Sequence, residues 1–292
     1  MDRMTRFSTL VSLALFASYC ASQLHTNPNT ALAGSRFDID INGSTVIVDG
    51  VQNTVRLLSS DLKVLAEIGG SGWGDDQFDR PAGVWAGNGI DIFVADYGNH
   101  RIQRFDRKLA FISSFSTRER PNPDERFGYP TDVAVSRLGD LFICDSENDR
   151  VLKVSGLSKV ERTFGGFDAG KGRLRNPVNI EIGPNDNVVV HDMAVNDQQN
   201  DRIMVFDTFG NFIRILGDGL FSGTLLMDAD ENGVVVLAEN RIIMFDRNDR
   251  LVLTEELQTL NVRNARSFVI DRNSLCFLTA DGFQRLPDPR KQ

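Results

Sequence analysis

The chain has 292 residues, of which 41% are hydrophobic and 25% are charged, so it has enough apolar material for a globular core. It contains 20 phenylalanines against 3 tyrosines and 2 tryptophans, and phenylalanine favours pleated, half-buried surfaces. The formal net charge of −8 repels phosphate backbones at long range. This balance argues against general affinity for nucleic acids.

The first 22 residues have the pattern of an export signal. A basic start is followed by an uncharged, apolar run over residues 7–21, which ends in small residues. This run is shorter than the roughly 20 residues that a membrane-spanning helix needs. We therefore expect cleavage after Ala21 or Ser22 and a secreted or periplasmic protein without a membrane span. Cys20 follows a sequence that resembles a bacterial lipobox only loosely, so a lipid-anchored form is the alternative.

After this signal, a short apolar run that ends in an acidic residue recurs along the chain. The acidic residues stand at positions 49, 96, 145, 192 and 239, so the steps between them are 47, 49, 47 and 47 residues. A degenerate sixth copy ends at Asp281. Self-similarity at this period indicates a repeat architecture.

The third copy shows how one repeat is organised. Apolar runs at residues 133–135, Leu141–Cys144 and Arg150–Val154 are separated by turn residues, and an outer strand is predicted near Lys159–Phe164. Each repeat is thus expected to form four short antiparallel strands. Stacking such sheets radially covers both faces of each sheet and leaves only short, protected edges. The sequence predicts an all-β fold, a six-bladed β-propeller of four-stranded antiparallel blades.

The repeats also carry a family resemblance. The second copy reads F-x-x-P-x-G-V at Phe78–Val84 and then I-F-V-A-D-x-G-N-H-R-I at Ile92–Ile102, and the third copy repeats the pattern. These motifs resemble the NHL repeat, and the chain looks like a bacterial-type exported NHL repeat protein over about residues 37–286. The resemblance implies six blades. It implies no single function, because the family has protein-binding, RNA-binding and enzymatic members.

The resemblance also sets the expected domain boundaries. A signal over residues 1–22 and a linker over 23–36 precede the propeller at 37–286, and a tail over 287–292 follows it. The sixth repeat ends after its third strand. An outer strand precedes each inner strand in the repeat order, so residues 29–35 are expected to complete the sixth blade. A bare outer edge is the alternative.

Acidic residues and arginines that recur together are expected to be scaffold. A carboxylate beside a turn accepts backbone hydrogen bonds, and a guanidinium can pair with it bidentately. The pairs are Asp96 with Arg101, Asp145 with Arg150, Asp192 with Arg202, and Glu239 with Arg241. A functional site is expected to break the symmetry of the repeat, and these pairs follow it.

Departures from the repeat indicate a binding surface on one face of the ring. The fourth copy has an insertion at residues 193–200, and the loops at 117–126 and 168–176 are expected on the same face. The candidate residues of this basic rim and insertion are Arg118, Arg120, Arg126, Lys171, Arg173, Arg175, Asp197, Gln198 and Gln199. We expect them to bind a protein, peptide or glycan. Solvated loops are the alternative, because neighbouring acidic residues dilute the charge.

The alternative function is a metal-dependent lyase or lactone hydrolase with a site in the central channel. The chain has only 3 histidines, too few for a zinc site built from several blades. Where the inner strands begin, Asp132, Asn179 and Ser267 could offer oxygen atoms to a calcium ion, but Arg36 and Leu226 interrupt the set. We therefore expect no resident metal or other cofactor.

Two cysteines, Cys144 and Cys276, remain after the signal. They lie in the third and sixth repeats, which face each other in a ring of six and are too far apart for a disulfide. We expect two buried thiols that pack as small apolar side chains. One chain is expected to form the whole ring, so we expect a monomer.

Overall fold

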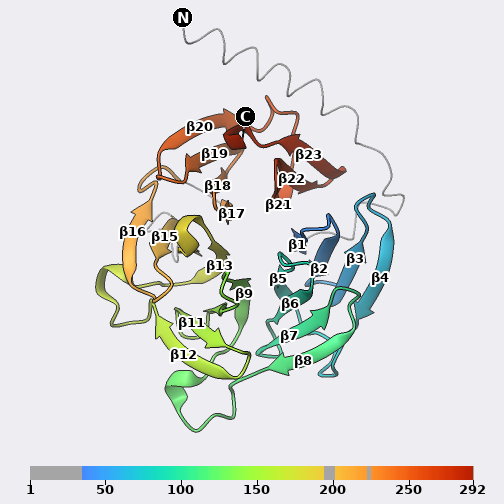
Figure 1. The fold of residues 1–292 in the computed structure, drawn as a ribbon, viewed down its shortest axis with the longest axis vertical. Helices are drawn as coiled ribbons and strands as arrows, with labels where there is room; N and C mark the ends of the chain where they lie inside the picture. Colours follow the sequence, from blue (N-terminus) through green and yellow to red (C-terminus); the bar gives the residue numbers. More distant parts are fainter. Residues whose placement is uncertain (1–34, 194–200, 222–224, 292) are drawn as a thin grey trace, which may run out of the picture.

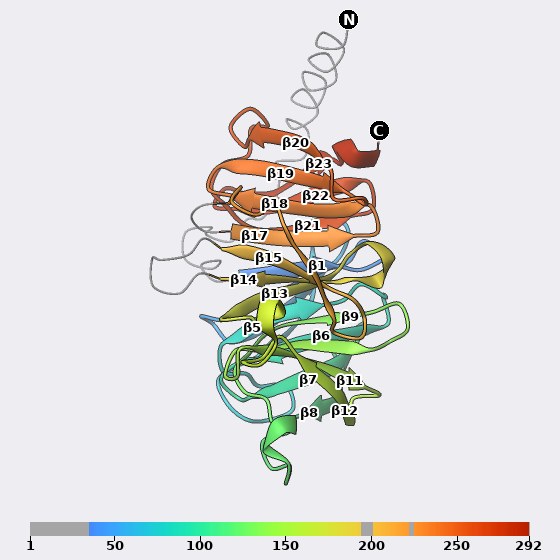
Figure 2. The same ribbon diagram turned by 90° about the vertical axis from the view of Figure 1, so that its left-hand side faces the viewer.

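Six small antiparallel sheets form the blades of a closed ring in the computed structural model of the protein, which describes residues 35–193, 201–221 and 225–291. Figure 1 looks down the ring, with the first strand of each blade at the centre and the last at the rim. Figure 2 shows the ring edge-on, with the strands running across its thickness. The predicted all-β, six-bladed propeller is confirmed.

Each blade is a meander in which consecutive strands pair antiparallel. Blade one is β1 (Ser35–Ile39), β2 (Thr45–Asp49), β3 (Thr54–Leu58) and β4 (Val64–Gly69); blade two is β5 (Pro81–Trp85), β6 (Asp91–Asp96), β7 (Arg101–Asp106) and β8 (Phe111–Phe115); blade three is β9 (Pro130–Val135), β10 (Leu141–Asp145), β11 (Arg150–Ser155) and β12 (Lys159–Phe164).

The second half of the ring repeats this order, but its last blade has three strands. Blade four is β13 (Pro177–Ile182), β14 (Val188–Asp192), β15 (Arg202–Phe206) and β16 (Phe212–Leu216); blade five is β17 (Leu225–Asp230), β18 (Gly233–Ala238), β19 (Arg241–Asp246) and β20 (Leu251–Glu256); blade six is β21 (Ala265–Asp271), β22 (Ser274–Thr279) and β23 (Gly282–Pro287). Short 3-10 helices are η2 (Pro123–Glu125), η3 (Gly170–Gly172), η4 (Pro184–Asp186) and η5 (Pro289–Lys291).

The core lies between neighbouring blades. Every residue of β10 is buried, because both faces of the strand are covered, whereas the outer strand β12 is mostly exposed or half-buried. Between blades one and two, for example, Val46 and Val48 pack in one cluster with Val94 and Phe105. The apolar runs of the repeats are therefore buried by radial stacking.

The ring closes where blade six meets blade one. Phe37 on β1 packs with buried side chains of β22, and its ring centre lies 5.5 Å from that of Phe283 on β23. β1 begins at Ser35, slightly before the predicted boundary of the propeller. Of residues 29–35, predicted to complete blade six, Ser35 instead belongs to β1 of blade one, where it pairs with Asp49. Residues 29–34 lie outside the described residues, so the strand that they would form stays a prediction. Cys144 and Cys276 are buried, free thiols, as expected.

Candidate functional site

The inner strands line a channel through the ring, and the residues at their starts meet at one end of it. A cavity of about 40 Å³ there is lined by Arg36, Asp132, Asn179, Leu226 and Ser267, among others. These are the positions that the sequence predicted to lie together. His191 on β14 also lines this cavity, and its Nε2 lies 2.8 Å from an oxygen of Asp201.

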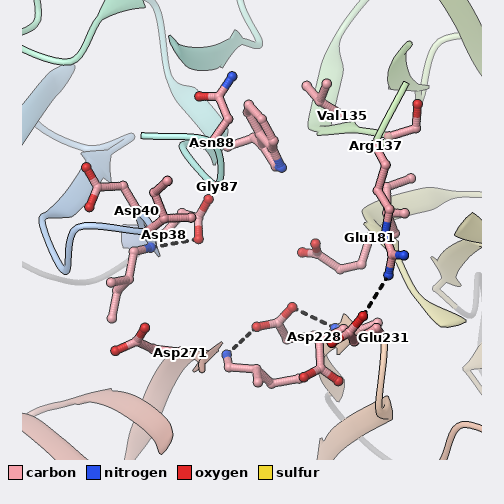
Figure 3. A pocket seen from close by; sticks show the side chains of 18 of the residues that line it. Asp38, Asp40, Gly87, Asn88, Val135, Arg137, Glu181, Asp228, Glu231 and Asp271 are labelled. Carbon is pink, nitrogen blue, oxygen red and sulfur yellow. Dashed lines mark hydrogen bonds and ion pairs between the residues drawn. The ribbon is translucent and has the colours of Figure 1, made fainter. Parts of the chain in front are cut away.

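A much larger cavity, of about 520 Å³, occupies the other end of the channel (Figure 3). It is lined by the ends of the inner strands and the turns that follow them. Acidic residues from four blades line it, and we call them the acidic mouth: Asp38, Asp40, Glu181, Asp228, Asp230, Glu231 and Asp271. The predicted basic rim lies on loops that lead into the inner strands, at the opposite end of the ring.

Three residues of the acidic mouth, Asp38, Glu181 and Asp228, lie deepest on the inner strands. Their carboxylates point toward the open centre of the cavity in Figure 3. In the described part of the chain, none of the three forms an ion pair with a lysine, arginine or histidine. Three of the outer acidic residues, in contrast, have cationic partners: Arg137 lies 3.1 Å from Glu231, Arg290 lies 3.2 Å from Asp230, and Arg285 lies 2.9 Å from Asp271. Asp40 accepts hydrogen bonds from the backbone N–H groups of Asn42 and Ser44.

The surroundings of these three carboxylates favour their neutral forms. Burial, followed by the charges of Asp228, Asp132 and Asp38, raises the pKa of Glu181 well above its usual range. Burial raises the pKa of Asp228 to about 8 and that of Asp38 to about 6, although both accept backbone hydrogen bonds that act in the opposite direction. No lysine, arginine or histidine of the described chain stabilises their ionised forms, so a cation placed there would favour ionisation and be bound by the charge that results.

Apolar side chains lie between the carboxylates. Trp85, Val135, Ile182, Ala229 and Ile270 line the same cavity. A pocket that combines apolar side chains with charged groups suits an organic ligand. An ammonium or guanidinium group on an alkyl stem matches this arrangement, because the stem contacts the walls while the charged head reaches the carboxylates.

Asn179 lines the smaller cavity and has an unused acceptor. Its side-chain Nδ2 donates to Asp132 at 2.5 Å and lies 3.3 Å from Oε1 of Glu181. The residue is 3% exposed, and its Oδ1 has no hydrogen-bond partner among the described residues. Buried acceptors are normally satisfied, so this oxygen is available to a donor that enters the channel.

The predicted metal set around Asp132 and Asn179 does not form a complete metal site. The Arg36 guanidinium lies 3.8 Å from Oδ2 of Asp132, where it already supplies positive charge. The same oxygen accepts hydrogen bonds from Asn179 and from the backbone N–H of Ile180. Within residues 35–193, 201–221 and 225–291, no three His, Cys, Asp or Glu side chains are placed to hold a metal ion.

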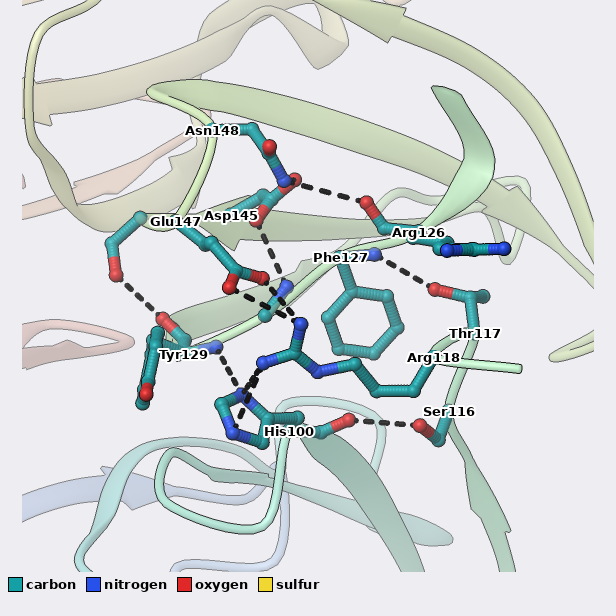
Figure 4. Close-up of polar contacts among 12 residues, drawn as sticks. His100, Ser116, Thr117, Arg118, Arg126, Phe127, Tyr129, Asp145, Glu147 and Asn148 are labelled. Atoms are coloured by element: carbon teal, nitrogen blue, oxygen red, sulfur yellow. Dashed lines mark hydrogen bonds and ion pairs between the residues drawn. The ribbon is translucent and has the colours of Figure 1, made fainter. Parts of the chain in front are cut away.

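The arginines of the loop between blades two and three have partners within the protein. Arg118 lies between His100 and Glu147 (Figure 4), with its Nη1 at 2.9 Å from Oε2 of Glu147. Arg120 lies 2.6 Å from Glu125, and Nε of Arg126 donates to the backbone carbonyl of Arg120. These contacts stabilise the loop and reduce the positive charge available to a ligand.

The loop between blades three and four contributes the rest of the predicted basic rim. The guanidinium of Arg173 stacks on the exposed ring of Phe167, 4.3 Å from its centre. Lys171 lies in η3, and the backbone N–H of Arg175 donates to Asp192. Asp197, Gln198 and Gln199 lie outside the described residues. The role of the basic rim in binding stays a prediction.

A family model of the NHL repeat matches residues 78–105 and 127–154, which are the first three strands of blades two and three with the loop residues before them. The chain is a β-propeller that contains NHL repeats.

Two curated relatives match about half of this NHL-repeat propeller. The first is the Caenorhabditis elegans protein named "Probable peptidyl-alpha-hydroxyglycine alpha-amidating lyase pgal-1". The two chains are 30% identical over 168 residues, and the alignment covers 52% of this chain and 43% of the relative.

The second relative is "Protein brain tumor" of Drosophila melanogaster, 29% identical over 145 residues, with 49% of this chain and 13% of the relative covered. The chain thus spans less than half the length of the curated relatives it matches. Among solved structures, virginiamycin B lyase from Staphylococcus aureus has a TM-score of 0.61 at 15% identity, covering 86% of this chain and 78% of that one. Kuenenia stuttgartiensis hydrazine synthase has a TM-score of 0.57 at 11% identity, covering 92% and 99%. Both structures support the propeller fold alone.

The recurrent pairs of the NHL-repeat propeller fix the loops that enter blades two, three and four. Asp96 lies 2.8 Å from Arg101 and also accepts a hydrogen bond from the backbone N–H of Asp79. Asp145 lies 2.9 Å from Arg150 and accepts a hydrogen bond from the backbone N–H of Gly128. Asp192 pairs with Arg202 and accepts from two loop N–H groups. In blade five, Glu239 lies in the turn before Arg241 with a φ of 55°.

The deep carboxylates Asp38, Glu181 and Asp228 were missed in the sequence. They stand two residues after Arg36, Asn179 and Leu226, positions that the repeat alignment placed at the start of inner strands. Side chains two residues apart on a strand point to the same side. Applying this period to the aligned repeats would have placed all three carboxylates in the channel.

No helix among the described residues is both long and apolar enough to cross a membrane.

Proposed function

We propose that this NHL-repeat propeller is a binding module that receives a lysine or arginine side chain of a protein or peptide partner in the acidic mouth. The observation that carries the proposal is the group of Asp38, Glu181 and Asp228, three carboxylates without a cationic partner in the described chain, at the deep end of a cavity of about 520 Å³. Of the expected ligand classes, a protein or peptide supplies a cation and a neutral glycan does not.

The physical argument rests on charge and wall chemistry together. Carboxylates in a site of low polarity interact strongly with a cation, because little water screens them. The apolar walls match the methylene stem of lysine or arginine, and Trp85 adds an aromatic surface to the cavity. The free amide oxygen of Asn179 supplies a neutral acceptor further along the channel.

The enzyme alternative has one observation in its favour. The buried Oδ1 of Asn179 lies on a side chain that also contacts Asp132, and one curated relative is named as a lyase. The incomplete set of ligands around Asp132 places this alternative second. Metal analysis of the purified protein separates the two: stoichiometric calcium or zinc would favour the lyase or lactone hydrolase.

The proposal can be tested with a small peptide probe. Blocked Gly-Gly-Lys-Gly-Gly is titrated into isotope-labelled protein, and the backbone amides of Ala86 and Ile270, which donate to Asp38 and Asp228, are followed by NMR. We expect these signals to shift with the lysine peptide and to stay unchanged with its Nε-acetylated form, which carries no charge.

Variants locate the binding face. Glu181→Gln with Asp228→Asn should weaken binding at least tenfold, which corresponds to about 1.4 kcal/mol. The matched control reverses three charges of the basic rim, Arg120→Glu, Arg173→Glu and Arg175→Glu, and should leave the affinity unchanged. Binding that survives in the first variant and disappears in the second would reject the acidic mouth and favour the rim.

A further inference from the structure

The turns around the acidic mouth differ between the two halves of the ring. In blades one to three, each turn after the inner strand exposes an aliphatic side chain: Ile41 is 54% exposed, Ile90 67% and Leu138 83%. Ile41 itself lines the cavity, as do both neighbours of Leu138, and Asn88 of the same turn as Ile90 lines it too. We call these three residues the apolar arc.

Two turns of the apolar arc are in direct contact. A Cβ added at Gly89, which has a φ of +67°, would lie 2.9 Å from Cγ1 of Ile41 and 2.7 Å from Nδ2 of Asn42. The turn of blade two therefore lies against the turn of blade one, with Ile90 directly after the contact. Exposed aliphatic side chains are individually common on protein surfaces, but here one stands in the corresponding turn of each of three consecutive blades, beside one cavity.

The other half of the mouth is charged and internally paired. Arg137 reaches across the mouth from blade three to Glu231 at 3.1 Å and lies 3.5 Å from Asp186. Asp230 contacts Arg290 at 3.2 Å and Lys291 at 2.9 Å. Asp40, on the other side, is buried and accepts hydrogen bonds from the backbone N–H groups of Asn42 and Ser44. A ligand with several positive charges therefore finds its main uncompensated group of carboxylates in the deep one.

We infer that the partner segment carries a single lysine or arginine flanked by apolar residues, with the cation in the acidic mouth and its neighbours on the apolar arc. This inference rests on the proposed function and specifies its ligand. Two features of the cavity match such a segment, one by charge and one by apolar contact. The deep carboxylates accept one cationic side chain, and the exposed aliphatic residues beside the cavity contact whatever flanks that side chain.

The size of the effect follows from apolar burial. Covering an aliphatic side chain removes enough surface from water to improve binding by roughly tenfold for each well-packed flanking residue. A segment of consecutive basic residues does not gain this affinity. Its extra cations would face apolar side chains and acidic residues that are already paired.

Three blocked peptides test the inference: Gly-Leu-Lys-Leu-Gly, Gly-Gly-Lys-Gly-Gly and Gly-Lys-Lys-Lys-Gly. We expect the leucine peptide to bind at least tenfold more tightly than the other two. Ile90→Ser with Leu138→Ser should abolish this advantage and leave the affinity of the glycine peptide unchanged. The matched control, Val64→Ser with Leu251→Ser, alters exposed aliphatic residues on the outer strands β4 and β20 and should change nothing.

The possible failures can be told apart. Equal affinities for the leucine and glycine peptides, with binding still dependent on Glu181 and Asp228, would overturn the apolar arc and leave the proposed function standing. Tightest binding of the tri-lysine peptide would also overturn the inference, in favour of a polybasic partner. If none of the peptides binds, both the inference and the proposed function are rejected.

Discussion

The carboxylate of Asp38 on β1 accepts a hydrogen bond from the backbone N–H of Ala86, 2.6 Å away and just beyond the end of β5. This contact joins blade one to blade two. Asp132 accepts in the same way from Ile180, and Asp228 from Ile270. Inner-strand aspartates therefore join three pairs of adjacent blades, and two of them, Asp38 and Asp228, also provide the charge of the acidic mouth. Both oxygens of Asp38 and of Asp228 accept backbone hydrogen bonds, so substitution by asparagine removes the charge and keeps one of the two acceptors.

Asp228→Asn should flatten the pH dependence of stability. With a folded-state pKa of about 8 against about 4 when unfolded, the native protein binds a proton more tightly than the unfolded chain does. Stability conferred by this group is therefore present at low pH and falls as the pH rises from about 4 to about 8. We expect the wild type to lose on the order of a few kcal/mol from pH 5 to 8 through such groups, and the variant to lose less.

Chemical denaturation at several pH values measures this difference. Asp246→Asn is the matched control, because that exposed aspartate has a pKa lowered by backbone hydrogen bonds from Arg250 and Asn248. Its contribution is present above its unfolded pKa and is lost only as the pH falls below about 4. An Asp228→Asn profile parallel to the wild type between pH 5 and 8 would contradict the raised pKa.

Binding of a lysine peptide should strengthen as the pH rises from 6 to about 8.5. A cation favours ionised carboxylates, so binding releases protons from Asp228 and Asp38, whose pKa values are about 8 and about 6. The lysine itself stays charged throughout, because its own pKa is about 10.4. Calorimetry in buffers of different ionisation enthalpy would measure the protons released. A constant affinity with no proton release would speak against binding at these groups.

Gly83→Ala should destabilise the boundary between blades two and three. A Cβ at this position would lie 2.2 Å from Oδ1 and 2.7 Å from Cα of Asp132, so the inner strands β5 and β9 would have to separate. We expect a loss of about 1–3 kcal/mol, as for other overpacked sites. Gly166→Ala is the control, since its new Cβ would meet only Cβ of Arg150, at 3.9 Å. Thermal denaturation of both variants tests the prediction, and equal midpoints would refute it.

Arg101→Met should lower the free energy of unfolding more than a comparable substitution at the surface. The side chains of Arg101 and Asp96 are 9% and 0% exposed, and the guanidinium also donates to loop carbonyls, including that of Gln77. Removing it leaves a buried carboxylate without its partner, which costs about 3–5 kcal/mol. In Arg56→Met the lost pair with Glu67 is partly exposed, and we expect less than about 1 kcal/mol. Urea denaturation compares the two, and similar losses would argue against a scaffold role.

Export predicts a defined N-terminus for the mature protein. When the full chain is expressed in a host with a general secretion pathway, we expect it outside the cytoplasm with a first residue of Ser22 or Gln23. Mass spectrometry of the N-terminal peptide reads this directly. Retention of the intact N-terminus in the cytoplasm would contradict export, and a lipid on Cys20 would establish the anchored alternative.

The repeat period determined the fold from the sequence alone. Five copies at steps of 47 to 49 residues, with a degenerate sixth, predicted six blades, and the recurrence of Asp96 and Arg101 in later copies identified them as scaffold. Such features are local: each strand, turn and acid–arginine pair lies within one repeat or beside it, so neighbouring residues suffice to specify it.

Only the tertiary structure decided where the candidate site lies. The sequence placed it on basic loops because they break the repeat, yet Arg118 and Arg120 of those loops pair within the protein. Asp38, Glu181 and Asp228 are far apart along the chain, and none stands out as a motif. Closure of the ring brings them to one cavity. Their pKa values depend on that burial and on one another's charge, and both arise only when blades one, four and five surround the same channel.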